Sequence, residues 1–450
     1  MIEAILYKPK YHEINYYTQA NKKVAMCELC DLKTLHMKKS QNIRHEVSIL
    51  PQLDKACGLD MHKDSIVCFI SDKEGKEQQL KEFGTFTKDL QEIRDLLVKH
   101  GSPACLMEST GIYWLALYNI LTESGIPVTV ANPIHIKQIP KRKTDKKDAR
   151  WLCTLLLNGL VRASFVPCKE QQKLRELNRN RLFYTQQESR VKNRIVKVLE
   201  GKNIKIRSVV SNISTKSSMQ IITLLSQGIS DIETLIACCH GKVKTKKDKM
   251  RFALEGTLDG HSQEIIKMYL EDIAHIQSQI RKLEENIHSI VSQHYAEVVQ
   301  RIKKITGVGN YTAEVIISEI GENMDIFPTA DHLTSWAGLA PGNNESAGKH
   351  RNTAVKKGNK YLRVALITVA WAAVRTKDSY WRALYLNLTK RIKMKRQKAI
   401  VAIARRLLKV AYNVIKGSKE YQEKGFQLFF ELQIKNKQKL YQLAQNVRPS

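Results

Sequence analysis

The chain has 450 residues and carries 74 Lys and Arg against 44 Asp and Glu, which gives a formal net charge of +30. Its length predicts two or three domains with ordinary cores, and its hydrophobic content of 43% excludes a disordered or fibrous protein. No apolar run approaches the roughly 20 residues that span a bilayer, and the N-terminus lacks the apolar segment of a signal peptide, so we expect a cytoplasmic, nucleoid-associated protein with no membrane partner. The excess of positive charge favours nucleic acid as the partner.

The N-terminal segment, residues 1–52, is polar, rich in Tyr and Lys, and without clear periodicity, and we interpret it as an extension of uncertain role. Within it, Cys27 and Cys30 form a CxxC pair that is followed by His36 and His45. These histidines do not have the spacing of a zinc finger, and a lone CxxC pair is weak evidence for a metal. Zinc at Cys27 and Cys30 is therefore the less favoured interpretation.

Residues 53–160 alternate strand and helix patterns, which predicts an α/β domain. Two short apolar runs within residues 55–70 are separated by a polar turn, and they predict a β-hairpin with Asp60 at the end of its first strand. Residues 102–108 predict a short buried strand whose last residue is Glu108, and an acid inside a core is costly unless it is paired or bound to a metal. Helices are predicted over residues 87–100 and 111–124, and a further strand over residues 126–131.

Asp145 and Asp148 precede an apolar run that predicts a helix, which Thr144 or Asp145 would cap. Because the two aspartates are three residues apart, they share one helical face. Bases surround them, and acids that bind metal among bases that bind phosphate suit a polyanionic substrate. A solvated, charged segment before a helix is an equally good interpretation. The predicted phosphate-binding residues of this segment are Lys141, Arg142, Lys143, Lys146 and Lys147.

Asp60, Glu108, Asp145 and Asp148 would bring carboxylates from two strands and one helix to a single site. Divalent-cation phosphoryl transfer requires this arrangement, because Mg²⁺ prefers hard oxygen ligands and keeps open positions for phosphate and water. The chain has 44 acidic residues, however, and most acids on any chain face solvent. The sequence leaves Mg²⁺ and Mn²⁺ open as the cofactor.

Residues 161–300 predict a helical, coiled-coil region. Residues 168–200 are helical and charged, and a second helix near residues 262–300 carries apolar residues at alternating spacings of four and three, which is the pattern of a coiled-coil seam. This seam would either dimerise the protein or pack against the earlier helix as an intramolecular hairpin, and the sequence leaves both open. The seam residues are Tyr269, Ile273, Ile276, Ile280, Leu283, Ile287 and Ile290.

Residues 302–321 resemble a helix-hairpin-helix, in which Gly307 and Gly309 form a turn that opens an apolar helix. Backbone N–H groups at the start of such a helix suit a phosphate without reading the base sequence. Lys303 and Lys304, just before the turn, are predicted contacts to the nucleic-acid backbone. The alternative is a helix–turn–helix packing element that makes no contact with DNA.

The predicted C-terminal domain, residues 301–417, also contains Ser346 in a Gly-rich, basic loop. Small neighbours let a phosphate approach the serine, and Lys349 and Arg351 would bind it, so Ser346 is a candidate nucleophile. The alternative is a hydroxyl that only caps the backbone, and composition alone favours that interpretation. Residues 418–450 predict a basic helical tail.

Taken together, several segments resemble the Asp-Glu-Asp-Asp transposases of insertion sequences, a family that includes bridge-RNA-guided recombinases and pilin-gene invertases. The resemblance covers about residues 55–417 in order. In the first part of the chain it rests on Gly-Leu-Asp60-Met-His-Lys, Met-Glu108-Ser-Thr-Gly-Ile-Tyr-Trp, Asn132-Pro and Lys-Thr-Asp145-Lys-Lys-Asp148-Ala. In the C-terminal part it rests on Ile-Thr-Gly307-Val-Gly, Trp336-Ala-Gly-Leu-Ala-Pro341, Ser346-Ala-Gly348 and Gly358-Asn-Lys-Tyr-Leu-Arg363.

The resemblance implies a first domain related to RNase H and Holliday-junction resolvases, and a mainly helical transposase domain at the C-terminus. Asp60, Glu108, Asp145 and Asp148 match the family's metal-binding tetrad, and Ser346 matches its nucleophilic serine, which forms a covalent phosphoserine with DNA. The resemblance also implies the partners. These are donor and target DNA, a structured bridge RNA that selects both DNAs by base pairing, and further copies of the chain in a homodimer or homotetramer.

Two interpretations compete with a serine recombinase. One is a structure-selective nuclease of the junction-resolvase type, which uses the acids and water and leaves Ser346 as a loop residue. The other is a non-catalytic, DNA-binding remnant of a transposase, which the presence of every family acid and of the serine disfavours. The loop reads Glu345-Ser-Ala-Gly instead of a tighter Ser-Gly pair, and this leaves Ser335 as a less favoured nucleophile. Residues 1–52 also depart from the family, whose members begin only a few residues before the first aspartate.

Overall fold

A computed structural model of the protein describes residues 52–109, 111–136, 145–161, 163–342, 344–346, 349–352, 354–355, 357–417, 420–423 and 425–427, together with residues 429, 431, 434 and 438. For Ile134, His135, Asp145 and Lys242, and for residues 344–346 and 349–352, it describes the backbone only. Cys27, Cys30, Lys141, Arg142 and Lys143 lie outside the described residues. The chain divides into two compact units, Met1–Val166 and Pro167–Ser450.

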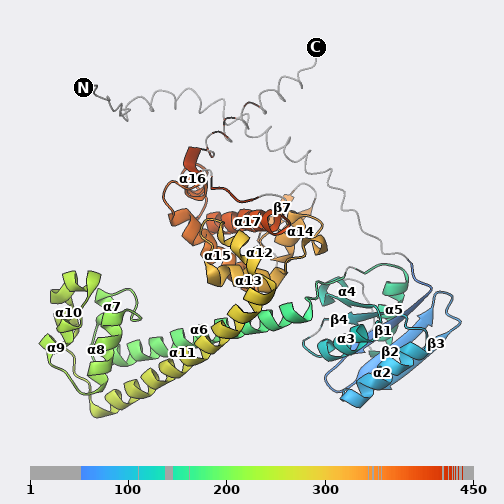
Figure 1. Ribbon diagram of the computed structural model, residues 1–450, viewed down its shortest axis with the longest axis horizontal. Helices are drawn as coiled ribbons and strands as arrows, with labels where there is room; N and C mark the ends of the chain where they lie inside the picture. Colours follow the sequence, from blue (N-terminus) through green and yellow to red (C-terminus); the bar gives the residue numbers. More distant parts are fainter. Residues whose placement is uncertain are drawn as a thin grey trace. The chain divides into compact units, whose positions relative to one another are not determined.

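The first unit is built on a mixed five-stranded sheet with the strand order β3-β2-β1-β4-β5 (Figure 1). The predicted hairpin and the predicted strand that ends at Glu108 are both confirmed. Neighbouring strands β1, β2 and β3 are antiparallel, whereas β4 is parallel to β1 and β5 is parallel to β4. The strands span Lys55–Met61 (β1), Ile66–Asp72 (β2), Gln78–Phe83 (β3), Ala104–Glu108 (β4) and Val128–Ala131 (β5).

Alternation along the strands sends apolar side chains to both faces of this sheet. On one face, Leu59 and Met107 pack into a core with helices α2 and α3, which correspond to the two helices predicted from the sequence. On the other face, Ala56 and Leu106 pack into a core with helix α5. The helices span Thr87–Lys99 (α2), Trp114–Glu123 (α3), Pro133–Ile136 (α4) and Asp145–Leu157 (α5).

The close approach of α5 to the sheet depends on Gly58 in the middle of β1. A Cβ at this position would overlap the carbonyl oxygen of Ala149 and lie 2.6 Å from the backbone nitrogen of Cys153, both on α5. Only a residue without a side chain lets the backbone of the helix rest directly on the strand. Gly58 therefore brings the first turns of α5 close to the strand that carries Asp60.

The second unit begins with a long helical arm. Helix α11 (Gly260–His294) returns alongside α6 (Lys169–Gly201), and Gln277 donates a 2.7 Å hydrogen bond to Glu188 across the pair (Figure 1). Of the two interpretations of the predicted seam, the structure shows the intramolecular hairpin. Short helices close the end of the arm and share one apolar core with α6 and α11: α7 (Ile206–Val209), α8 (Lys216–Ser226), α9 (Ile232–Ala237), η1 (Gly241–Lys246) and α10 (Lys247–Ala253).

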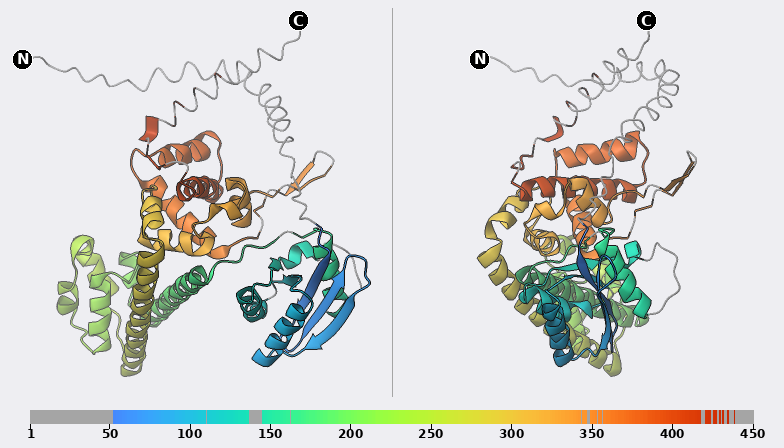
Figure 2. Two further views of the ribbon diagram at one scale, coloured as in Figure 1. Left: turned by 45° about the vertical axis from the view of Figure 1, so that its right-hand side comes forward. Right: turned by 90° about the vertical axis from the view of Figure 1, so that its right-hand side faces the viewer.

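The remainder of the second unit is a mainly helical body that carries one short hairpin. The hairpin of β6 and β7 projects from the helices (Figure 2). No helix in the described part of the chain is long and apolar enough to cross a membrane. The elements are α12 (Ala296–Lys303), α13 (Asn310–Ile320), η2 (Met324–Ile326), α14 (Ala330–Trp336), β6 (Asn344–Ser346), β7 (Lys349–Asn352), α15 (Lys360–Arg375), α16 (Tyr380–Leu386), η3 (Asn387–Arg391) and α17 (Arg396–Ile415).

Substituting Gly58→Ala should destabilise the first unit by about 3 kcal/mol or more, because the new methyl group forces α5 away from β1. Hydrogen exchange of the β1 and α5 amides measures this loss. Gly125→Ala is the control: nothing lies within 4 Å of a Cβ there, and its φ of +74° alone should cost only about 1 kcal/mol. Equal losses in the two variants would show that close approach is not the constraint.

Candidate catalytic site

Asp60 and Glu108 lie side by side at the carboxyl ends of two neighbouring parallel strands. The register pairs Leu59 of β1 with Met107 of β4, so the next residue of each strand is an acid. Leu59 and Met107 point into the core with α2 and α3. Because successive side chains alternate between the faces, both acids point to the face that α5 covers. Strand register alone therefore sets two carboxylates next to each other beneath one helix.

Asp60 is largely withdrawn from solvent, with only 9% of its surface exposed. Its Oδ2 lies 3.1 Å from Nε2 of His62, which compensates part of the cost of burying a carboxylate. The sequence interpretation did not single out His62. The sequence feature that points to His62 is its spacing of two residues from Asp60, because residues two apart in an extended segment lie on the same face.

Helix α5 carries the other two acids of the predicted tetrad. It begins at Asp145 and carries Asp148 on its first turn, next to the Ala149 carbonyl that rests on Gly58. Asp148 is half-buried, and its Oδ1 is inaccessible to solvent. The bases Lys146, Lys147 and Arg150 that flank these acids on the helix are exposed.

Metal binding at this edge stays a prediction. Where side chains are described, no group of three or more His, Cys, Asp and Glu residues is gathered closely enough to hold an ion. Asp60, Glu108 and Asp148 carry carboxylate oxygens, which are the hard ligands that Mg²⁺ and Mn²⁺ prefer. All three lie on the side of the sheet that α5 covers. Asp145 is described by its backbone alone, as the first residue of α5.

Cys57 of β1 and Cys153 of α5 are buried in the two cores of the first unit. Burial raises the pKa of Cys153 to about 12 and raises the pKa of Cys57 well above its ordinary value. Both are therefore neutral thiols near pH 7, and the thiolate is the form that attacks or binds metal. The polar chemistry of this edge belongs to the carboxylates and to His62.

Ser346 lies in the second unit, at the end of strand β6. It pairs with Lys349 of β7, and His350 pairs with Glu345. Farther from the tip, Gly342 N–H donates a 3.0 Å hydrogen bond to the Ala354 carbonyl. The loop predicted from composition is thus a two-stranded hairpin, and Lys349 and Arg351 lie on its second strand. Ser335, the less favoured nucleophile, is an exposed residue of helix α14.

The segment predicted to resemble a helix-hairpin-helix consists of α12, a turn and α13, an arrangement that fits both that interpretation and a helix–turn–helix packing element. Gly307 has a φ of +90°, and a Cβ there would lie 2.7 Å from Val369 O and Ala373 N, so the packing of α15 requires this glycine. Gly309 caps α13 and has open space around it, as the predicted phosphate contact requires.

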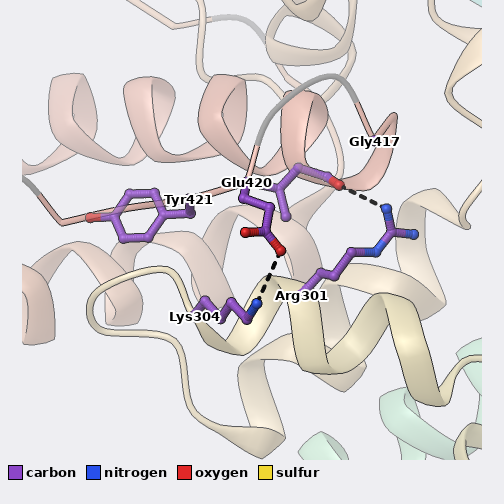
Figure 3. A pocket seen from close by; sticks show the side chains of 6 residues that line it. Arg301, Lys304, Gly417, Glu420 and Tyr421 are labelled. Atoms are coloured by element: carbon purple, nitrogen blue, oxygen red, sulfur yellow. Dashed lines mark hydrogen bonds and ion pairs between the residues drawn. The ribbon is translucent and has the colours of Figure 1, made fainter.

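Two basic residues beside this turn line a pocket with the end of α17 (Figure 3). Nζ of Lys304 lies 3.3 Å from Oε1 of Glu420, and Nη1 of Arg301 donates a 3.4 Å hydrogen bond to the carbonyl of Val414. Lys304 is exposed despite this ion pair, whereas Lys303 is half-buried. Of the two predicted backbone contacts, Lys304 is the more exposed.

Comparison with known proteins identifies similar chains. Residues 57–204 match a profile of IS110-type DEDD proteins described as Transposase, and residues 299–386 match the profile described as Transposase IS116/IS110/IS902 family. These two matches confirm the resemblance that the sequence motifs carry.

Several curated relatives are similar over parts of their length. The Insertion element IS110 uncharacterized 43.6 kDa protein of Streptomyces coelicolor is 29% identical over 38% of this chain and 40% of that protein. The Putative transposase y4pF/y4sB of Sinorhizobium fredii is 24% identical over 68% of this chain and 70% of its own length. The Pilin gene-inverting protein of Moraxella bovis is 28% identical over 35% of this chain. This chain spans about two fifths of the first of these relatives and 50% of the last.

Asp60→Asn should lower the affinity of the protein for Mn²⁺ about tenfold or more, because it removes a charged oxygen from the acidic edge. Isothermal titration calorimetry with MnCl₂ measures the affinity. The matched control is Asp64→Asn, the same change at an exposed residue of the turn after β1, which should leave the affinity within about twofold. Equal Mn²⁺ affinity in wild type and Asp60→Asn would remove Asp60 from the metal site.

Proposed function

Because the chain belongs to the IS116/IS110/IS902 family of transposases, we propose that it cleaves, exchanges and rejoins DNA strands with the help of divalent metal ions. One observation carries this proposal: Asp60 and Glu108 lie at the carboxyl ends of neighbouring parallel strands and face α5, which begins at Asp145 and carries Asp148. The strand order supports an RNase H-like domain of the junction-resolvase type. In such a domain, acids at this edge bind the ions that act on a phosphate.

In the proposed reaction, the acids Asp60, Glu108, Asp145 and Asp148 bind Mg²⁺ or Mn²⁺. The bound ions supply Lewis-acid stabilisation of charge on the phosphate. The Oγ of Ser346 forms a bond to the DNA phosphorus while the bond from phosphorus to a sugar oxygen breaks, and the serine proton ends on the departing sugar oxygen. A sugar hydroxyl of the exchanged strand then attacks the phosphoserine, which restores the serine and rejoins the DNA.

The proposed partners are donor and target DNA, a bridge RNA that selects them, and further copies of the chain in a homodimer or homotetramer. The net charge of +30 supports binding to several phosphate backbones, which positions duplexes without reading their sequence. The similarity to a Pilin gene-inverting protein supports strand exchange, since inversion of a gene requires cleaved strands to be rejoined. Lys304, Gly309 and the residues of β7 are the proposed phosphate contacts of the second unit.

Ser346→Ala should abolish a covalent complex between the protein and DNA while leaving DNA binding intact. Purified protein is incubated with Mg²⁺, the junction DNA of its element and RNA from the element's flanks, and the adduct is detected by its retarded migration under denaturing conditions. Ser335→Ala is the matched control and should form the adduct at the wild-type rate. Cleavage by wild type and Ser346→Ala without an adduct would favour the junction-resolvase type of nuclease, and no cleavage by either would favour the non-catalytic remnant.

Lys304→Ala should weaken binding to all DNA sequences alike and lower the slope of log affinity against log salt by about 1. The control is Lys267→Ala, because Lys267 is also exposed and also forms a 3.3 Å ion pair, with Glu264. Fluorescence anisotropy with several unrelated duplexes measures both slopes. A loss confined to one DNA sequence would exclude a backbone contact at Lys304.

A further inference from the structure

A buried carboxylate in the second unit joins three helices. Glu319 lies near the end of α13 and exposes 1% of its side chain. Arg179 of α6 holds it with two hydrogen bonds, from Nε to Oε1 at 2.9 Å and from Nη2 to Oε2 at 2.8 Å. Asn359 donates a third hydrogen bond, from Nδ2 to Oε2 at 2.6 Å. The carboxylate therefore links α6 and α13 to the residue that precedes α15.

A second arginine makes this connection rigid. Nε of Arg175 lies 3.3 Å from Oε2 of Glu319, and its guanidinium also donates to the carbonyls of Ser318 and Glu319 at 3.2 and 2.7 Å. Burial lowers the pKa of Arg175 to about 10, so this group remains a cation near pH 7. The two parallel bonds from Arg179 fix the plane of the Glu319 carboxylate as well as its position, and Arg175 adds bonds to the backbone beside it.

Asn359 stands at the root of the segment that carries the serine. Its Oδ1 accepts hydrogen bonds of 3.0 Å from the N–H groups of Tyr361 and Leu362, which caps α15. At the preceding residue, Gly358, a Cβ would overlap the backbone nitrogen of Gly338. The two ends of residues 338–358 thus touch, and the β6–β7 hairpin extends from this point.

We propose that Glu319 and Asn359 are positioning residues for Ser346, a role that rests on the proposed function. The Arg179–Glu319–Asn359 chain fixes the C-terminal root of the hairpin to α6 and α13, so that the hairpin presents the serine in one orientation. Neither residue touches the reacting atoms. A displacement of about 1 Å at a nucleophile costs on the order of 100-fold in rate, which is why the root of a short hairpin needs such support.

Asn359→Ser separates this role from that of a simple helix cap. Serine is a good cap, but its shorter side chain removes the amide that donates to Glu319. The matched control is Asn323→Ser. Asn323 caps η2 with a 2.9 Å bond from Asp325 N–H, and it is not among the described residues that donate hydrogen bonds to the Glu319 carboxylate. Asn359→Asp is a second variant, which keeps the cap and sets a carboxylate against Glu319.

Three measurements are made on the full chain: hydrogen exchange of the β6 and β7 amides, the rate of adduct formation at saturating DNA, and the DNA affinity. We expect Asn359→Ser to speed the exchange and to slow adduct formation about tenfold or more, with DNA affinity within about twofold of wild type. Asn359→Asp should show the same pattern more strongly, and Asn323→Ser should match wild type.

Unchanged hairpin exchange in both Asn359 variants would overturn the proposal. Parallel losses of DNA affinity and thermal stability would also overturn it, because they would assign the network to the stability of the whole body. Absence of a serine-dependent adduct in the wild type would refute the proposed function instead, and the exchange measurement would still decide whether Glu319 and Asn359 position the hairpin.

Discussion

The contact between Gly58 and the backbone of α5 is the constraint on which the first unit depends. It decides which face of the sheet the helix covers and how near its first turn comes to the strand that carries Asp60. Carboxylates repel one another and lose hydration when they are buried, so a fold gains nothing in stability by collecting them. The sheet nevertheless directs Asp60 and Glu108 toward the helix that carries Asp148, and His62 compensates part of the charge of Asp60. In the proposed function, a divalent cation supplies the remaining compensation, because its preferred ligands are hard carboxylate oxygens.

In the second unit, a different constraint applies, because a short hairpin has to be held on a body made of helices. A two-stranded hairpin has marginal stability by itself. Here both ends of its segment meet at Gly338 and Gly358, and Asn359 is tied to the buried Glu319. Burying a carboxylate between arginines is a weak source of stability, because desolvation offsets most of the attraction. The network instead fixes the position of α6 relative to α13, because any shift between these helices breaks hydrogen bonds to the Glu319 carboxylate.

Much of this could be predicted from the sequence, and the rest could not for physical reasons. The hairpin at Asp60 and the strand ending at Glu108 follow from alternation and turn residues, which are local signals. The seam of α11 was visible, but a coiled-coil pattern is the same whether the partner helix is in the same chain or in another, so only the structure shows α6 as the partner. Gly58 and Glu319 act through residues far away in sequence, and the one local hint at Glu319 was an acid within an apolar helix. The hairpin around Ser346 was missed because a Gly-rich, basic segment has no clear strand period.

The two kinds of chemistry in the proposed reaction explain why one chain carries both units. Acids and metal ions alone direct water onto a phosphate, and hydrolysis releases the free energy of the broken ester bond, so a cut made in this way does not reseal by itself. Attack by Ser346 replaces one phosphate ester with another of similar energy, and the bond is kept in the protein until a new strand arrives. The proposed exchange, in which the cut strands are rejoined through a serine ester without an external energy source, therefore requires Ser346 in addition to the acids. It also requires that water be kept from the phosphoserine, which gives a precise placement of the serine more weight in a recombinase than in a nuclease.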